Sequence, residues 1–174
     1  AKQFNITKMR WCIAGGETGQ ESIRNGLDAI AAEEPGDTVV MVHDGNRCLV
    51  SDEIISNSLA TFKQHGSAVA AIPCVEAVFR SNDNGISSDI SIPREQLFRT
   101  QTPHTYTLEK LLWAHEAAKE KCITNTAASC TLMQALGEEI YFSKGSEENL
   151  KITTVDDMII FKALLHTKKD EWLK

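Results

Sequence analysis

The sequence has no apolar run close to the roughly 20 residues that a membrane-spanning helix needs. No secretory signal peptide is recognisable at its start. It also has no block of five like charges, and its net charge is −6. A membrane and a nucleic acid are therefore not expected as partners, whereas a small phosphorylated ligand held by two or three cations remains compatible with the sequence.

The sequence lacks a paired pattern of cysteines. The five cysteines are odd in number and form no C-x-x-C motif: Cys12, Cys48, Cys74, Cys122 and Cys130. Unpaired thiols of this kind are typical of reduced cytoplasmic proteins rather than of disulfide-stabilised secreted domains. We therefore expect a cytoplasmic protein.

Segments of strand type and helix type alternate along the first half of the 174 residues. Their spacing predicts strands and helices in the order 9–14, 22–32, 38–43, 51–65 and 67–72. The run TVVMVH at 38–43 is typical of a central parallel strand that is buried on both faces. Strands separated by helices require crossover connections, which predict one α/β domain over 1–174 with a Rossmann-like, doubly wound and mainly parallel sheet.

The alternation stops after Pro73. Residues 75–98 predict two or three short strands around the turn Asn82-Asp83-Asn84-Gly85, too exposed to belong to the main sheet. We expect a protruding β-arm that pairs with a second copy of the chain to form a homodimer. Helices at 108–121 and 126–136, a strand at 139–143 and a helix at 155–165 are expected to follow.

Four polar loops follow predicted strands: 15–22 (GGETGQES), 43–47 (HDGNR), 99–105 (RTQTPHT) and 146–154 (SEENLKITT). In an open parallel sheet, ligands bind beyond the carboxyl ends of the strands, and helix N-termini there present N–H groups to anions. We therefore expect the four loops to contribute to one site.

Each loop also has an alternative interpretation that is purely structural. Gly15-Gly16 ahead of Ser22, at a predicted helix start, can approach an anion or a base, or can simply connect a strand to a helix. Asp44 can hold a ribose hydroxyl or Mg²⁺, or can be a solvated partner of Arg47, whose guanidinium suits phosphate.

Two further segments carry the same ambiguity. Lys151, between Leu150 and Ile152 on a predicted short strand, can face a ligand pocket or lie on the surface of an edge strand. Thr102-Pro103 is interpreted as a rigid turn, and His104 beside it as a structural residue.

Five segments, taken in order, resemble the successive motifs of the 2-C-methyl-D-erythritol 4-phosphate cytidylyltransferase family, including its ribitol 5-phosphate relatives. The segments are "GGETGQESIRNGL", "VVMVHDGNRCLVS", "GSAVAAIPCVEAVFRS", "REQLFRTQTPHTY" and "NLKITTVDDM". The resemblance covers essentially the whole chain. It implies transfer of a cytidylyl group from CTP, with Mg²⁺ as cofactor, to a polyol phosphate, first 2-C-methyl-D-erythritol 4-phosphate and alternatively ribitol 5-phosphate or another polyol phosphate. A nucleotide-binding or dimerisation module without activity is the alternative from another class.

The resemblance also implies roles for individual residues. Those matching the cytidine and nucleotide contacts are Gly16, Glu17, Ser22, Asp44, Gly45 and Arg47. Those matching the acceptor side are Arg94, Thr102 and Lys151. Lys151, Arg94 and Asp44 would be the catalytic group, and Arg94, on the arm, would complete the site of the neighbouring subunit.

The sequence departs from the family pattern at several positions. Gly19 stands where an arginine is common, Cys48 where proline is usual, and Ala77 where an arm threonine touches the acceptor. The family's first glycine-rich loop, which holds the triphosphate, has no counterpart here, and we expect it on a strand that precedes Ala1. Nucleotide chemistry is thus implied more directly than the identity of the acceptor.

Overall fold

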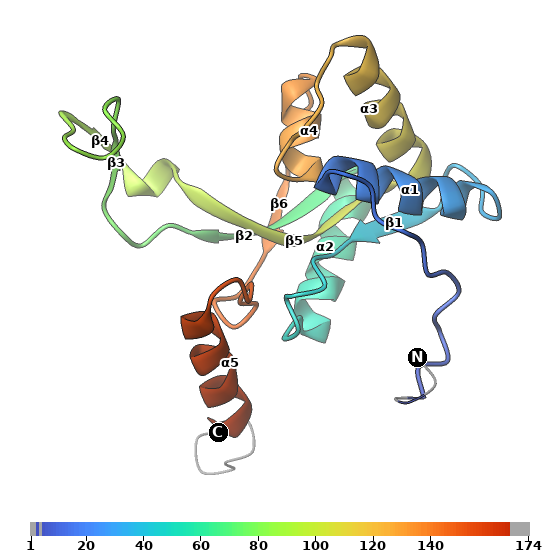
Figure 1. Cartoon of the computed structure of the whole chain (residues 1–174), viewed down its shortest axis with the longest axis horizontal. Helices are drawn as coiled ribbons and strands as arrows, with labels where there is room; N and C mark the ends of the chain where they lie inside the picture. Colours follow the sequence, from blue (N-terminus) through green and yellow to red (C-terminus); the bar gives the residue numbers. More distant parts are fainter. Residues whose placement is uncertain (1–2, 4, 168–174) are drawn as a thin grey trace. The chain divides into compact units, whose positions relative to one another are not determined.

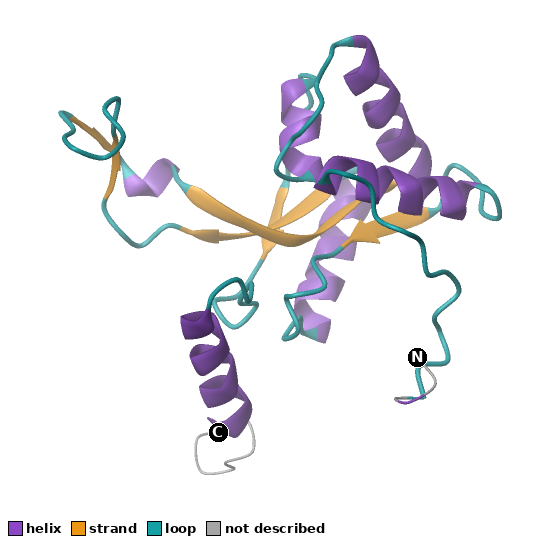
Figure 2. Cartoon of the chain, in the orientation of Figure 1, coloured by secondary structure: helices purple, strands orange, loops and turns teal. Residues whose placement is uncertain are grey.

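A computed structural model describes residue 3 and residues 5–167 (Figures 1 and 2). The chain divides into two compact units. The first contains the described residues up to Val42 together with Thr105–Ile140, and the second contains His43–His104 together with the described residues from Tyr141 onward.

The first unit is built around three helices. Helix α1 (Gly19–Ala31) packs against α3 (Leu108–Glu120), which in turn packs against α4 (Ser129–Ala135). The unit also holds strand β1 (Val39–Val42). Its core is formed by fully buried apolar side chains, among them Leu27, Leu108, Leu111, Leu132 and Met133. Because such side chains leave water on folding, this core contributes most of the unit's stability.

The second unit contains α2 (Asp52–His65), β2 (Ala68–Pro73), β6 (Phe142–Lys144) and most of β5 (Phe98–Thr107). Helix α2 begins and ends as its sequence predicts, because the Ser51 side chain caps its first turn and Gly66 adopts a left-handed φ of 78° after its last residue. The helix packs on β2 and β6. Strand order in the four-stranded sheet is β1-β5-β2-β6, and β2 and β6 are parallel, with Val69 opposite Phe142.

The predicted hairpin is confirmed. Strands β3 (Val78–Arg80) and β4 (Ile90–Ile92) are antiparallel and form a separate two-stranded sheet. A short 3-10 helix, η2 (Arg94–Gln96), leads from β4 to β5. Asp83 organises the tip by accepting hydrogen bonds from the Ser81 and Ser87 hydroxyls, each at 2.5 Å. Phe79 and Ile86 remain 58% and 87% exposed, so the hairpin leaves these two apolar side chains uncovered.

Helix α5 (Val155–Thr167) follows the last polar loop. It begins with a reciprocal cap, in which the Asp157 N–H donates to the Thr154 hydroxyl at 3.1 Å and the Asp157 carboxylate accepts from the Thr154 N–H at 2.7 Å. None of its described residues is fully buried. No helix in the described part of the chain has the length and apolar character to cross a membrane.

The α/β fold with a mainly parallel sheet is confirmed, but two strand predictions for the first half of the chain are wrong in detail. Residues 9–14 form no strand, and Met9 and Ile13 are 53% and 47% exposed. This segment is instead held by side chains, since the Trp11 indole donates to Glu33 at 2.8 Å. β1 lies at the edge of the sheet rather than in its centre, which leaves Val39 41% exposed.

The segment 99–105, predicted as a loop, lies in β5, a ten-residue strand between β1 and β2. Polar residues and a proline argue against a central strand when only the sequence is considered. The strand forms because the buried polar side chains have partners, as with the Gln101 amide, which donates to the Ser146 carbonyl at 2.8 Å. Thr102-Pro103, predicted as a turn, is a cis peptide within this strand.

Candidate functional site

The polar cluster of the second unit is centred on Asp44. One oxygen of its carboxylate, Oδ2, lies 3.1 Å from Arg47 Nε and 3.1 Å from Lys151 Nζ. The Asp44 backbone N–H donates to the Thr102 hydroxyl at 2.9 Å. Three of the four predicted loops, those at 43–47, 99–105 and 146–154, are therefore brought together within this unit.

Arg47 is fixed from two sides. Besides its bond to Asp44, its Nη1 donates to the Asn149 carbonyl at 2.7 Å, and only 11% of its side chain is exposed. The guanidinium therefore has a structural role in joining two loops. Gly45, inside the same turn, has no neighbour within 4 Å of an added Cβ, so packing does not require glycine there.

The charge state of Asp44 follows from its surroundings. Burial alone would raise the pKa of this carboxyl, but hydrogen bonds and charge from Lys151 and Arg47 outweigh it, and the net pKa is lowered. Asp44 is therefore ionised at neutral pH. One carboxylate between two cations leaves a net positive charge, which favours an anionic ligand.

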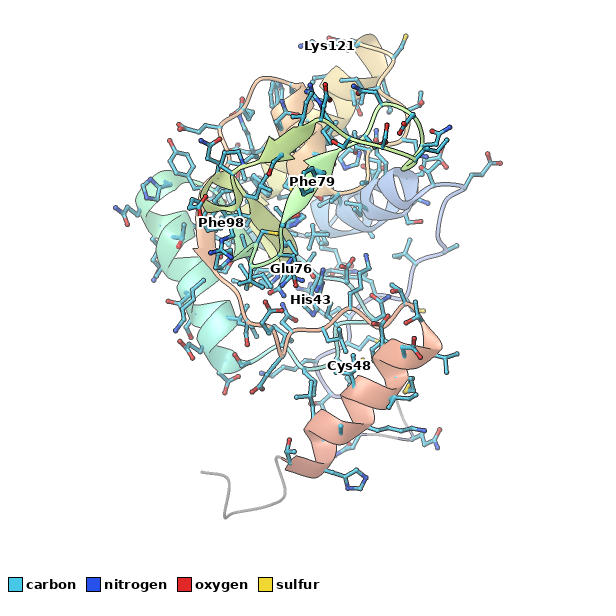
Figure 3. The ribbon with its side chains drawn as sticks, turned by 90° about the vertical axis from the view of Figure 1, so that its left-hand side faces the viewer. His43, Cys48, Glu76, Phe79, Phe98 and Lys121 are labelled. Atoms are coloured by element: carbon cyan, nitrogen blue, oxygen red, sulfur yellow. The ribbon has the colours of Figure 1, made fainter. Side chains whose placement is uncertain are left out.

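His43 and Thr102 hold the beginning of this loop, which the His43 and Cys48 labels mark in Figure 3. The His43 ring lies 3.0 Å from the Thr102 hydroxyl through Nδ1 and 3.1 Å from the Arg47 carbonyl through Nε2. A carbonyl only accepts, so Nε2 carries the proton, and the Thr102 hydroxyl donates to Nδ1 while it accepts from the Asp44 N–H. The network fixes one tautomer of His43, a residue for which the sequence predicted no role.

A buried amide pair holds the loop that carries Lys151. The Gln101 side chain bonds both backbone groups of Ser146, accepting at 3.2 Å and donating at 2.8 Å. Asn149, which is fully buried, donates to the Thr102 carbonyl at 2.9 Å. Sequence reasoning missed Gln101 and Asn149, because amide residues in polar segments carry no periodic signal.

Lys151 lies in an irregular segment rather than on the predicted strand. The backbone next to it forms hydrogen bonds with the loop after β1 instead of with a strand. Ile152 exchanges two hydrogen bonds with Asn46, at 3.0 and 2.9 Å. The expected alternation is nevertheless present: Leu150 and Ile152 are half-buried, whereas the Lys151 side chain is 44% exposed. Lys151 thus reaches Asp44 as expected.

The Gly-Gly loop belongs to the first unit. The Gly16 N–H donates to the Ser22 hydroxyl at 3.0 Å, and the Glu17 N–H donates to the Glu21 carboxylate at 2.7 Å. A Cβ on Gly16 would lie 2.3 Å from Glu21 Cβ, so only glycine fits. The helix begins earlier than predicted, because Thr18 rather than Ser22 caps it.

Arg94 has a backbone partner outside the Asp44 cluster. It lies in η2, where its guanidinium donates to the Val75 carbonyl at 3.2 Å and is 61% exposed. His104 is buried in β5, and burial lowers its pKa to about 4, so it is neutral. In the described part of the chain, no group of three or more His, Cys, Asp or Glu side chains is placed to hold a metal ion.

Comparisons with known proteins agree with these motifs. A family model described as 2-C-methyl-D-erythritol 4-phosphate cytidylyltransferase (IspD) matches residues 2–167. A ribitol-5-phosphate cytidylyltransferase of Vibrio parahaemolyticus is 38% identical over 168 residues, which are 97% of this chain and 70% of that protein.

A 2-C-methyl-D-erythritol 4-phosphate cytidylyltransferase of Desulforamulus reducens is 38% identical over 162 residues, 92% of this chain and 66% of that protein. The crystal structure of the enzyme of that name from Thermus thermophilus matches with a TM-score of 0.75 and 28% identity, over 87% of this chain and 71% of that one.

Proposed function

Because the chain belongs to the 2-C-methyl-D-erythritol 4-phosphate cytidylyltransferase family, whose members are CTP-dependent nucleotidyltransferases, we propose that it joins CTP to a polyol phosphate. The products are a CDP-polyol and pyrophosphate. The observation that carries the proposal is the cluster in which Asp44 holds Lys151 and Arg47 at 3.1 Å each. The acceptors to be compared are 2-C-methyl-D-erythritol 4-phosphate and ribitol 5-phosphate, which the names of the relatives supply.

In the proposed reaction, an oxygen of the acceptor phosphate attacks the α-phosphorus of CTP in line. A new P–O bond forms, the bond from the α-phosphorus to the bridging oxygen breaks, and pyrophosphate leaves. A phosphoryl transfer of this kind depends mainly on positioning and on neutralising charge that grows on the phosphate oxygens. Lys151 supplies a mobile cation for this purpose, and Asp44 aims its ammonium.

The remaining residues have supporting roles in this proposal. Gly16, Glu17 and Ser22 contact cytidine, because the backbone carbonyls of the Gly15–Gly16 turn suit the amine of cytosine.

Asp44 and Gly45 face the ribose, and Arg47 holds their loop against Asn149. Thr102 acts on the acceptor side by fixing the Asp44 backbone. A pocket that bonds the small pyrimidine ring would favour CTP over ATP.

Mg²⁺ fits this arrangement as an ion that accompanies CTP. It usually keeps several waters and binds one or two carboxylates together with substrate phosphates, so a dedicated cluster of protein ligands is not needed. Asp44, the carboxylate of the cluster, would hold the metal directly or through water when CTP is bound. When bound, Mg²⁺ would neutralise negative charge on the CTP phosphates.

The arm supports a homodimer in which each copy contributes to the site of the other. Its hairpin exposes Phe79 and Ile86, which is costly unless a partner covers them. Arg94, 61% exposed at the base of the arm, is the cation that would reach the acceptor phosphate of the second copy.

The test measures pyrophosphate release by protein produced from the complete gene. With CTP, Mg²⁺ and either acceptor, we expect turnover that disappears when the acceptor is omitted and that falls at least tenfold when ATP replaces CTP. CTP binding without turnover for either acceptor would contradict the proposal and favour a nucleotide-binding module without activity.

A further inference from the structure

Helices α1 and α3 of the first unit (Figure 1), together with the loop 122–124, line a cavity of about 360 Å³. Both helices contribute polar side chains to its wall, namely Gln20, Glu21, Arg24, His115 and Lys119. None of the residues that line this cavity has a role in the reaction proposed above. The cavity is therefore a candidate for a second binding site that does not depend on that reaction.

Gln20 fixes the shape of the cavity. Its side-chain amide donates to the Ile123 carbonyl at 3.0 Å, and its side-chain oxygen accepts from both the N–H and the hydroxyl of Thr126, each at 3.0 Å. These bonds join α1 directly to the loop that follows α3. The wall is thus formed before any ligand binds, as in most small-molecule sites.

The charged side chains at the wall already have partners. Arg24 and Lys119 both pair with the Glu116 carboxylate, at 2.6 and 3.2 Å. The Glu21 carboxylate accepts from the Glu17 N–H at 2.7 Å. An anionic ligand would meet Glu21, and a cationic ligand would meet Arg24 and Lys119. The charges therefore favour a neutral ligand.

His115 differs from these residues because it lacks a partner. It is 4% exposed, and its Nε2 atom is buried without a hydrogen bond to any described residue. Burial and the nearby Arg24 lower the pKa of the imidazole, so it is neutral at pH 7. A neutral imidazole nitrogen either donates or accepts, depending on the tautomer, and a hydroxyl group can satisfy both cases. A ligand that supplies this hydrogen bond removes the cost of an unpaired buried atom.

We propose that this cavity binds a small neutral alcohol or phenol, with the hydroxyl on His115 Nε2 and the apolar body against Ile123 and Cys122. The aliphatic stems of Arg24 and Lys119 complete the apolar surface while their charged ends keep their own partners. A volume of about 360 Å³ is near the lower end of the roughly 300–1,000 Å³ of small-molecule pockets, so it suits one ring rather than a nucleotide.

Four probes of similar size test the chemistry of the ligand on protein produced from the complete gene: benzyl alcohol, toluene, benzoate and benzylamine. In titrations followed by nuclear magnetic resonance, benzyl alcohol should bind at least about fivefold more tightly than each of the others, because it alone is both neutral and able to pair with the imidazole. Long-range ¹H–¹⁵N spectra should show that the Nε2 signal of His115 moves, whereas the ring signals of His43 and His65 do not.

Two variants test the role of the imidazole. His115→Leu should bind benzyl alcohol and toluene equally, because the polar partner of the hydroxyl is gone. His65→Leu is the matched control, since His65 stacks on Tyr141 in the second unit and should leave the preference for benzyl alcohol unchanged. A preference that survives in His115→Leu would overturn the proposed contact.

Thiol labelling of the wild-type protein provides a test that needs no variant. Cys122 lines the cavity and is exposed, so benzyl alcohol should slow its alkylation by N-ethylmaleimide several-fold. Cys12 and Cys48 are exposed elsewhere in the chain and should react at unchanged rates. Unprotected Cys122, equal binding of benzyl alcohol and toluene, or tighter binding of benzoate or benzylamine would overturn the site. Absent turnover together with protected Cys122 would overturn the proposed reaction and leave this site in place.

Discussion

Replacing Lys151 by alanine removes the mobile cation of the Asp44 cluster. Its Nζ lies 3.1 Å from Asp44 Oδ2, and its side chain is 44% exposed before substrates bind. Bound phosphates would exclude water from the ammonium, and removing one such group from a transition state costs about 3 kcal/mol in comparable sites. We therefore expect kcat to fall about 100-fold or more.

Stability should change much less than turnover. The ion pair is partly solvated, which limits its contribution to well under about 1 kcal/mol. Asp44 also keeps its bond to Arg47 at 3.1 Å, so the substitution does not leave a buried charge without a partner. Thermal unfolding of Lys151→Ala should therefore resemble that of the wild type.

Steady-state rates with saturating CTP and acceptor provide the assay. Lys144→Ala serves as the control, because the Lys144 ammonium on β6 also pairs with a carboxylate, that of Glu53, but in an exposed ion pair. Lys151→Arg should recover only part of the rate, because a wide planar fork does not replace a compact charge between two phosphates. Turnover of Lys151→Ala within twofold of the wild type would refute the catalytic role and identify Lys151 as an ordinary surface lysine.

Three further outcomes follow from single residues. Burial holds the pKa of His104 at about 4 in the folded protein, so between about pH 4 and 6.5 the unfolded chain binds more protons. The free energy of unfolding should therefore fall by up to about 3 kcal/mol as the pH drops from about 6.5 towards 4. Denaturant titrations of His104→Gln should show a weaker pH dependence, and an unchanged slope would contradict the buried, neutral state of His104. Gly16→Ala should raise the KM for CTP at least tenfold, because its Cβ would lie 2.3 Å from Glu21 Cβ, whereas Gly26→Ala in α1, with no neighbour within 4 Å, should not. Sedimentation at micromolar concentration should show a dimer that Phe79→Asp shifts towards monomer, and a wild-type monomer would contradict the role of the arm.

Local signals in the sequence predicted much of the fold. The Ser51 cap and the Gly66 stop bound α2 as observed, because both act through groups within a few residues. The hairpin of β3 and β4 was predictable from its turn chemistry. Strand β5 was not, because its Gln101 and Thr102 are stabilised by partners such as Ser146, which is distant in sequence and not detectable by periodicity.

The sequence likewise predicted only part of the candidate site. The Asp44–Lys151 contact was expected because both loops were predicted to follow the carboxyl ends of strands, and it forms at 3.1 Å. The groups that position these two residues, His43 and the Gln101–Asn149 pair, depend on hydrogen bonds between residues that are far apart in the sequence. The roles of Gly16, Glu17 and Ser22 remain predictions, because these residues belong to the first unit and the Asp44 cluster to the second.

The most direct test follows the reaction by ³¹P nuclear magnetic resonance. Protein produced from the complete gene is incubated with CTP, Mg²⁺ and ribitol 5-phosphate or 2-C-methyl-D-erythritol 4-phosphate. We predict that the triphosphate signals are replaced by those of a CDP-polyol diphosphate and of pyrophosphate in equal amounts, and that Lys151→Ala slows this conversion at least 100-fold. Persistence of the CTP signals with both acceptors, or conversion at the wild-type rate by Lys151→Ala, would contradict the account.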